Sequence, residues 1–278
     1  MNSVEFTLLV GLFGALAGFL GALTGLGGGV VITPVLTLLF GVDIRYAVGA
    51  TLVSVIATSS GAASAFLKEG FSNIRIGMFL EIATTFGAVT GAALATRIPT
   101  SALAVILGVV LLYSAILSTR PKPELHEASP GDPLARRLRL NSTCPTPHGW
   151  RPYAVERVRT GFALMFGAGA LSGMLGIGSG ALKVLAMDHA MRIPFKVSTS
   201  TSNFMIGVTA AASAGVYLHR GYIDPVLAMP VMLGVSLGSL LGARHLSGAE
   251  TRKLRIIFGA VVAILAAEMI YSGLTGRI

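Results

Sequence analysis

Six long apolar runs constrain the fold of this chain more than any other feature. They lie at residues 46–67, 75–96, 100–118, 195–218, 223–243 and 252–272. A helix needs about 20 apolar residues to cross the hydrocarbon core of a bilayer, so each run predicts one crossing. Only 12% of the residues are charged, whereas soluble domains carry roughly 25%. The sequence therefore predicts an all-α, polytopic membrane protein.

Two further apolar stretches are interrupted by glycine clusters. The stretch 6–40 contains Gly25-Leu26-Gly27-Gly28-Gly29, and the stretch 161–190 contains Gly176-Ile177-Gly178-Ser179-Gly180. Each stretch predicts a full helix, a break and a shorter helix. The chain would then have about five segments in each half, with roughly 8 full transmembrane helices plus broken or half helices.

A hydrophilic stretch separates the two halves. We predict a first transmembrane repeat at 1–118, a linker at 119–159 and a second repeat at 160–278. The linker is rich in proline and arginine, so it cannot be a crossing and is expected to be mobile. The positive-inside rule places it in the cytoplasm. Five segments per half put sixteen basic residues inside and four outside, whereas four segments give twelve and eight. We therefore expect a protein of the cytoplasmic (inner) membrane with both termini outside.

The two halves echo each other in sequence. The glycine clusters lie 151 residues apart, Ala62-Ala63-Ser64-Ala65 recurs at 211–214, and Gly87 recurs as Gly238. The nearly constant offset of 149 to 151 argues against chance. An odd number of segments per copy makes the copies inverted in the membrane, an arrangement of many secondary transporters, whose site lies near the midplane.

The glycine clusters themselves suggest an anion site. A break at membrane depth is tolerated only where protein or water satisfies its backbone groups. Helix N-termini offer unpaired N–H groups and a partial positive charge, and glycine leaves them accessible. The predicted site residues here are Gly25, Gly27, Gly28, Gly29, Gly176, Gly178, Ser179 and Gly180. The alternative is helix packing, which we favour for Gly14, Gly18, Gly87, Gly91, Gly238 and Gly242.

Several polar residues inside predicted crossings are further candidates. An ammonium at the depth of Lys183 is expensive unless it is paired or functional, so Lys183 could contact the anion. It could also reach the surface, or pair with Asp188 or Glu81. Glu81 is a candidate for proton coupling. Hydroxyls and an amide could bind oxyanion oxygens or join helices; these belong to Thr51, Ser54, Ser200 and Asn203. We expect Ser54 and Asn203 to occupy matching positions.

Other classes of function have little support in the sequence. The single cysteine, Cys144, has no metal-site spacing around it, so no metal or cofactor is predicted. The basic residues cluster in loops, which argues against nucleic-acid binding. Neither a reactive constellation nor a GxxxxGK[ST] motif is present, which argues against an enzyme or direct ATP use. The predicted partners are a small anion and the lipid bilayer, and a homodimer is left open.

The chain resembles the TauE/SafE family of sulfite and organosulfonate exporters. The resemblance rests on Gly25-Leu26-Gly27-Gly28-Gly29 followed by Pro34, on its echo at 176–180, and on the alanine- and serine-rich helix after each. It covers roughly 10–118 and 160–273, and it implies a carrier for sulfite, thiosulfate or an organosulfonate such as sulfoacetate. The second copy departs from the family pattern at Ser179, Lys183 and Leu185. We predict a secondary transporter, with an anion channel using the same site as the alternative.

Overall fold

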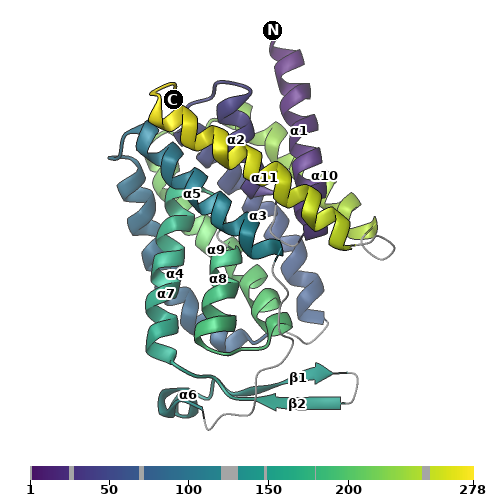
Figure 1. The fold of residues 1–278 in the computed structure, drawn as a ribbon, viewed down its shortest axis with the longest axis vertical. Coiled ribbons are helices and arrows are strands. Elements are labelled where there is room, and N and C mark those ends of the chain that lie inside the picture. Colours follow the sequence, from purple (N-terminus) through teal and green to yellow (C-terminus); the bar gives the residue numbers. More distant parts are fainter. Residues whose placement is uncertain are drawn as a thin grey trace.

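The protein is a helical bundle with one small hairpin at its end (Figure 1). The computed structural model describes residues 2–24, 28–68, 72–119, 131–146, 149–178, 180–245 and 251–278. Within these ranges, four helices are long and apolar enough to cross a membrane. They are Val4–Gly21, Ile74–Ala95, Val158–Leu175 and Pro225–Gly242. Shorter apolar helices accompany them, and the prediction of an all-α polytopic membrane protein is confirmed.

Each half contains five helical segments. The first half has α1 (Ser3–Thr24), α2 (Gly29–Leu38), α3 (Ile44–Lys68), α4 (Ile74–Ala95) and α5 (Thr100–Thr119). The second half has α7 (Val158–Leu175), α8 (Gly180–Leu185), α9 (Phe195–His219), α10 (Pro225–His245) and α11 (Thr251–Leu274). A π-helical turn, η1 (Ala186–Ala190), continues α8. All six long apolar runs form helices, and the last residues of the two glycine clusters, Gly29 and Gly180, begin α2 and α8.

The helices of the two halves start at a constant spacing. Residues 44 and 195 begin α3 and α9, residues 74 and 225 begin α4 and α10, and each pair is 151 positions apart. The offset of 149 expected for Ala62-Ala63-Ser64-Ala65 is therefore wrong, because α3 and α9 align without a gap. Ser54 aligns with Met205 instead of Asn203.

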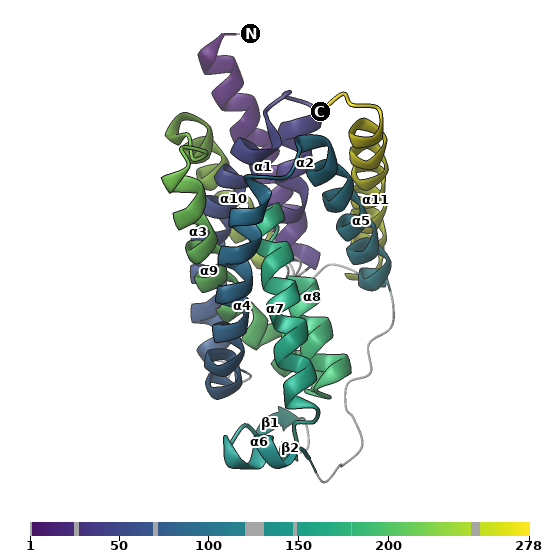
Figure 2. The same cartoon turned by 90° about the vertical axis from the view of Figure 1, so that its left-hand side faces the viewer.

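Helix packing repeats with the same spacing. The helix pair α1 and α10 has its counterpart in α7 and α4, while α3 packs on α9 and α5 on α11. Figures 1 and 2 both show α5 beside α11. A Cβ on Gly87 would lie 2.1 Å from the Phe166 carbonyl oxygen, and one on Gly238 would lie 1.9 Å from that of Ala15. These glycines let backbones touch, as predicted for packing, and the contacts have the symmetry that a two-fold repeat would produce.

The linker forms structure of its own. It contains α6 (Pro133–Arg137) and an antiparallel hairpin of β1 (Ser142–Thr146) and β2 (Gly149–Tyr153), in which Ser142 pairs with Tyr153. Figure 1 shows this hairpin at the end of the bundle opposite both termini. We expected a mobile linker. For residues 131–146 and 149–157 that expectation is wrong, because local hydrogen bonds and bundle contacts order them.

Asn73 fastens the linker to the bundle. Its Oδ1 accepts from the Ile76 N–H at 3.1 Å and so caps α4. Its Nδ2 donates to the Leu140 carbonyl at 3.2 Å and to the Tyr153 hydroxyl at 2.7 Å. Its N–H donates to the Thr201 hydroxyl at 3.1 Å. One residue thus joins α4, α9 and the linker.

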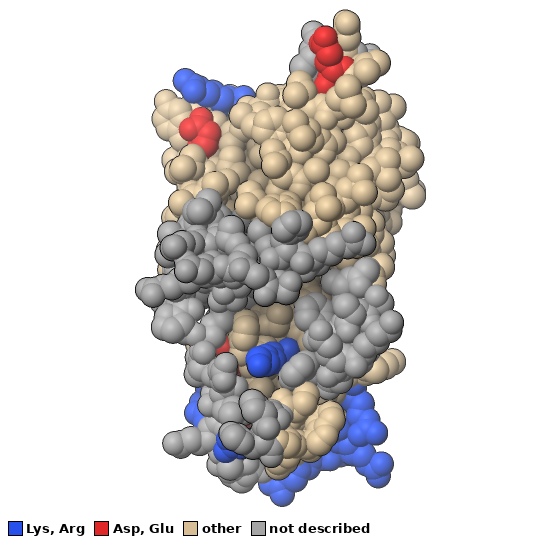
Figure 3. Space-filling view, turned by 90° about the vertical axis from the view of Figure 1, so that its right-hand side faces the viewer, with Lys and Arg blue, Asp and Glu red and all other residues tan. Residues whose placement is uncertain are grey.

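The charged side chains are distributed unequally between the two ends. Figure 3 shows lysine and arginine gathered at the linker end, with acidic side chains at the end that holds the N-terminus. The exposed arginines of the linker and of the start of α7 are Arg136, Arg137, Arg139, Arg151, Arg157 and Arg159. The positive-inside rule predicts a cytoplasmic location for such an end.

Candidate anion-binding site

The second glycine cluster ends one helix and starts another. The helix α7 stops at Leu175, and Gly176 caps it in the left-handed region with φ 70°. Gly178 is also left-handed, with φ 69°. Side chains disfavour this region, so glycine permits a sharp change of direction within the bundle. The chain then re-enters a helix at Gly180.

The described parts of the two clusters lie against each other. A Cβ placed on Gly29, at the start of α2, would be 3.6 Å from the Gly176 carbonyl oxygen. Gly28 and Gly176 are buried, and so are Gly29 and Gly178. The predicted site residues Gly25, Gly27 and Ser179 lie outside the described residues. The start of one short helix therefore touches the break that precedes the other.

Two branched side chains line these glycines symmetrically. A Cβ on Gly29 would be 2.7 Å from Val55 Cγ2, and one on Gly180 would be 2.9 Å from Ile206 Cδ1. Val55 and Ile206 are themselves 151 positions apart, and both also lie beside Gly178. In this conformation apolar groups of α3 and α9 lie against Gly29 and Gly178, which are buried, and against Gly180, which is partly exposed.

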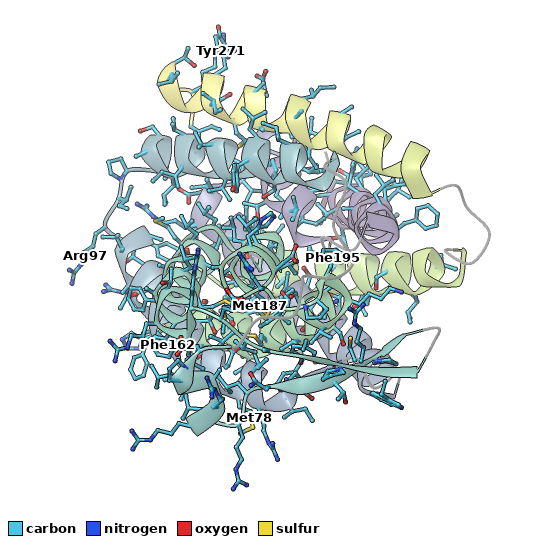
Figure 4. The ribbon with its side chains drawn as sticks, turned by 60° about the horizontal axis from the view of Figure 1, so that its bottom comes forward. Met78, Arg97, Phe162, Met187, Phe195 and Tyr271 are labelled. Carbon is cyan, nitrogen blue, oxygen red and sulfur yellow. The ribbon has the colours of Figure 1, made fainter. Side chains whose placement is uncertain are left out.

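Lys183 lies on α8 and is completely buried, with 0% of its surface exposed. Its Nζ donates to the Thr209 hydroxyl at 2.6 Å. Thr209 is one helical turn beyond Ile206 on α9, so the ammonium lies close to the break. This burial rules out the expectation that Lys183 reaches the surface. Figure 4 places Met187, from the turn that continues α8, in the middle of the bundle.

Glu81 of α4 completes a bridge between three helices. The Thr209 hydroxyl approaches Glu81 Oε1 at 2.8 Å and can donate to it, and the Thr85 hydroxyl donates to the same oxygen at 3.2 Å. Lys183 and Glu81 are thus paired through Thr209. Glu81 Oε2 is buried and has no hydrogen-bond partner among the described residues. This bridge therefore holds two opposite charges and one carboxylate oxygen that has no partner among the described residues.

Of the predicted hydroxyls, Thr51 lies at the first break. Its hydroxyl donates to the Ala47 carbonyl at 2.8 Å and accepts from the Thr33 hydroxyl of α2 at 3.0 Å. Its methyl would be 3.1 Å from a Cβ on Gly29. Ser54 is buried but donates to the Thr51 carbonyl of its own helix at 2.8 Å. Ser54 is therefore already satisfied locally.

The two remaining predicted residues are not brought to the breaks by any described contact. Ser200 hydrogen-bonds the Ser72 hydroxyl in the connection between α3 and α4, toward the linker end. Asn203 is half-buried on α9.

Three hydroxyls near the breaks were not among the site residues predicted above. These are Thr33, Ser202 and Thr209. Ser202 donates to the Gly180 carbonyl at 3.3 Å, and it lies 151 positions after Thr51. A strict spacing of 151 would have identified Ser202. Thr209 stands among apolar residues, and its hydroxyl can also bond its own helix through the Met205 carbonyl at 2.9 Å, so the sequence around it does not mark it as a site residue.

Comparison with known proteins places these features in a wider group. A family model described as "Sulfite exporter TauE/SafE" matches residues 10–269. The probable membrane transporter protein YunE of Bacillus subtilis is 27% identical over 281 residues, covering 98% of this chain and 99% of that protein. YdhB of the same bacterium is 28% identical over 238 residues, covering 85% and 87%. MJ0441 of Methanocaldococcus jannaschii is 26% identical, covering 96% and 97%. No solved structure gives a significant match.

Proposed function

The chain belongs to the TauE/SafE sulfite exporter family, and from that premise we propose that this membrane transporter carries a small anion between its two glycine-rich helix breaks. The substrate class is sulfite, thiosulfate or an organosulfonate such as sulfoacetate. The chain acts as a multi-pass transporter rather than an enzyme, in keeping with relatives named as probable membrane transporter proteins.

The observation that carries the proposal is the completely buried ammonium of Lys183 beside the second break. A charged group at membrane depth is costly, and such groups commonly mark substrate or ion pathways. Lys183 supplies one positive charge, and the start of α2 adds a partial positive charge from its backbone dipoles. An anion is the solute that both features favour.

The surrounding hydroxyls suit an oxyanion. Thr51 and Ser202 lie next to Gly29 and Gly180, the first residues of α2 and α8. Hydroxyl and backbone N–H donors can surround the several oxygens of a sulfite or sulfonate group, while Lys183 balances its charge. This arrangement supports sulfur oxyanions as a class without selecting one of them.

Alternating access follows from the packing. Val55 and Ile206 lie against the glycines in this conformation, and both belong to the helix pair α3 and α9, where the halves meet. Rocking one half against the other would uncover the breaks from one side at a time. We place the linker in the cytoplasm and both termini outside the cytoplasmic membrane, because the basic residues gather at the linker end.

The test uses purified protein in liposomes loaded with sulfite, thiosulfate or sulfoacetate. Internal unlabelled anion should accelerate uptake of the same labelled anion, because such trans-stimulation is a property of carriers. Uptake without trans-stimulation would indicate a channel. A thermal-shift screen with the same anions and with acetate would rank the substrates before the flux assay.

A matched pair of lysine variants tests the site. Lys183→Met should abolish uptake, because it removes the buried charge while keeping a long side chain. Lys196→Met should transport normally, because Lys196 is exposed at the start of α9. Uptake by Lys183→Met at the wild-type rate would contradict the proposed site.

A further inference from the structure

We propose that Glu81 takes up a proton each time Lys183 accepts an anion, so that protons move together with the substrate. This proposal rests on the anion transport proposed above and names its coupling ion. It is carried by the bridge from Lys183 through Thr209 to Glu81 and by the unsatisfied oxygen of Glu81.

Charge balance in the buried site explains the coupling. In the conformation described, the Lys183 ammonium and the Glu81 carboxylate compensate each other through the Thr209 hydroxyl. A monovalent anion beside Lys183 would add one uncompensated negative charge in a region of low dielectric, which is unfavourable. If the carboxylate gains a proton and becomes a neutral acid, the ammonium and the anion balance. The site is then neutral before and after binding.

Glu81 can accept this proton at an oxygen that no donor occupies. Oε1 receives the Thr209 and Thr85 hydroxyls, whereas Oε2 is buried and has no partner among the described residues. The proton can therefore bind Oε2 without first displacing a donor from Oε1. The side chain is 9% exposed, so bulk water offers it little compensation.

Thr209 provides the switch between the two states. Its hydroxyl has one proton and two acceptors within reach, Glu81 Oε1 at 2.8 Å and the Met205 carbonyl at 2.9 Å. When Glu81 is ionised, donation to the carboxylate is the stronger bond. When Glu81 is neutral, the hydroxyl can turn to Met205, and Lys183 is then held less tightly and can face the anion.

Among the described charged groups on the helices around Glu81, Lys183 is the one that interacts with it electrostatically. The helix α4 packs against α7 and α9. The described charged groups of those helices are Arg159, Lys196 and His219, all exposed near helix ends. The other titratable group on α9 is the buried phenol of Tyr217, which donates to the Met174 carbonyl at 3.1 Å. On α4 itself Arg75 is exposed, and the segment after α8 carries Asp188, which is buried, and His189, which is exposed. A proton suits this place better than a metal cation, because the Lys183 ammonium would repel the metal.

The first experiment measures protons and anions together. Liposomes containing the protein and a trapped pH dye are supplied with sulfite, thiosulfate or methanesulfonate. Methanesulfonate keeps a fixed single charge, so any proton that moves with it is carried by the protein. We expect about one proton for each methanesulfonate ion, because the site stays neutral. A ratio near zero, or transport driven by a sodium gradient instead, would overturn the proposal.

The variant Glu81→Gln separates proton transfer from anion binding. The amide imitates the neutral acid but cannot take up a proton, so anion binding, followed by thermal shift, should lose its dependence on pH. Proton movement should fall to background. Glu268→Gln is the control, because Glu268 is an exposed carboxylate on α11. Wild-type proton coupling in Glu81→Gln would contradict the proposal.

An infrared titration tests the proton site without any substrate. Acidification should produce a protonated-carboxyl band in wild type and in Glu268→Gln that is missing in Glu81→Gln. Failure of wild type to exchange any anion would refute the proposed function, whereas exchange without protons would refute the coupling alone. If Glu81→Gln does not fold, the proton-to-anion ratio of wild type and its infrared titration still decide.

Discussion

The two halves of the molecule share a scaffold but differ in chemistry at matching positions. The second half has Lys183 on α8 and Thr209 on α9, which face Glu81 of α4. At a spacing of 151 the equivalents are Ile32, Thr58 and Met232. Ile32 is buried like Lys183, with 1% of its surface exposed. The repeat therefore duplicates the framework of the site, whereas the ionic bridge, which joins α8 and α9 of the second half to α4 of the first, is not repeated at the equivalent positions.

The paired threonines show how this difference arises. Thr58 donates to the Ser54 carbonyl of its own helix at 3.0 Å. Thr209 has the same kind of bond to Met205, at 2.9 Å, and in addition contacts Lys183 and Glu81. A hydroxyl in a helix can always return to its own backbone. It becomes a link between helices only where the neighbours supply charged partners.

The largest expected effect comes from replacing Lys183 of the second half with isoleucine, the residue at the equivalent position of the first half. Lys183→Ile should reduce anion transport about 100-fold, because losing a partner from a buried charge pair typically costs 2 to 5 kcal/mol or more. It should also lower the stability of the folded protein by about 3 kcal/mol, because the Glu81 carboxylate is left without a counter-charge. Anion flux and the thermal midpoint in detergent measure the two losses.

A double variant separates these consequences. Lys183→Ile with Glu81→Met introduces the apolar residue types that Ile32 and Met232 have at the equivalent positions, so most of the lost stability should return while transport stays low. A double variant as unstable as Lys183→Ile would show that the two residues are not coupled. A double variant that transports would show that the anion does not need this charge.

The scaffold could be predicted from the sequence because it depends on local patterns. Every apolar run became a helix, since a backbone in lipid has no other way to satisfy its hydrogen bonds. The packing of Gly87 and Gly238 was also expected from their spacing. The linker was harder, because the hydrogen bonds of Asn73 to Leu140 and Tyr153 join residues far apart in the chain, and no local pattern reports them.

The next effect tests whether the scaffold is as symmetric as it looks. Gly87→Ala and Gly238→Ala should each destabilise the protein by about 2 kcal/mol, because each new Cβ would meet a backbone carbonyl and force two helices apart. The control is Gly167→Ala on α7, where a Cβ would have nothing within 4 Å. Thermal midpoints of the three variants give the comparison. Clearly unequal losses of stability at Gly87 and Gly238 would show that the two helix contacts are not equivalent.

A smaller effect distinguishes a glycine needed by the site from one needed only by the backbone. Gly178→Ala and Gly221→Ala place a side chain at φ 69° and φ 74°, so each should cost about 1 kcal/mol of stability. Near Gly221 a Cβ would have nothing within 4 Å, whereas near Gly178 it would be 3.2 Å from Ile206. Roughly tenfold slower transport is therefore expected for Gly178→Ala alone. Equal flux in both variants would remove Gly178 from the site.

The candidate site was only partly predictable from the sequence. Lys183 and Glu81 were recognised because charges are rare in crossings, and the two were named as possible partners. Thr209 was not, because its role depends on helices that are distant in sequence meeting at one point. Ser54 was chosen by a spacing of 149, but aligned helix starts show that 151 is correct. Polar residue type alone could not tell a ligand-facing hydroxyl from one that bonds its own helix.

The smallest expected difference between a variant and its control concerns the ends of the bundle, where Asn73 and Asp224 occupy matching positions and cap α4 and α10. Asp224 Oδ1 accepts from the Val226 N–H at 2.8 Å, whereas Asn73 also donates to the linker. Asp224→Ala should cost about 1 kcal/mol, and Asn73→Ala about 1 kcal/mol more, because it also loses those bonds. Asn73→Asp keeps a cap and loses the donor, so its loss of stability should be smaller than that of Asn73→Ala.

The thiol of Cys144 can report this difference directly. Its side chain is 4% exposed within the linker, and burial raises the pKa of the thiol, so a maleimide should react mainly when the linker opens. A loss of 1 kcal/mol from linker docking corresponds to roughly fivefold faster labelling in Asn73→Ala. Labelling of Asp224→Ala should match wild type, because its cap lies at the end without a linker. Equal labelling in both variants would mean that Asn73 is a cap like its counterpart and that the linker is held by other contacts.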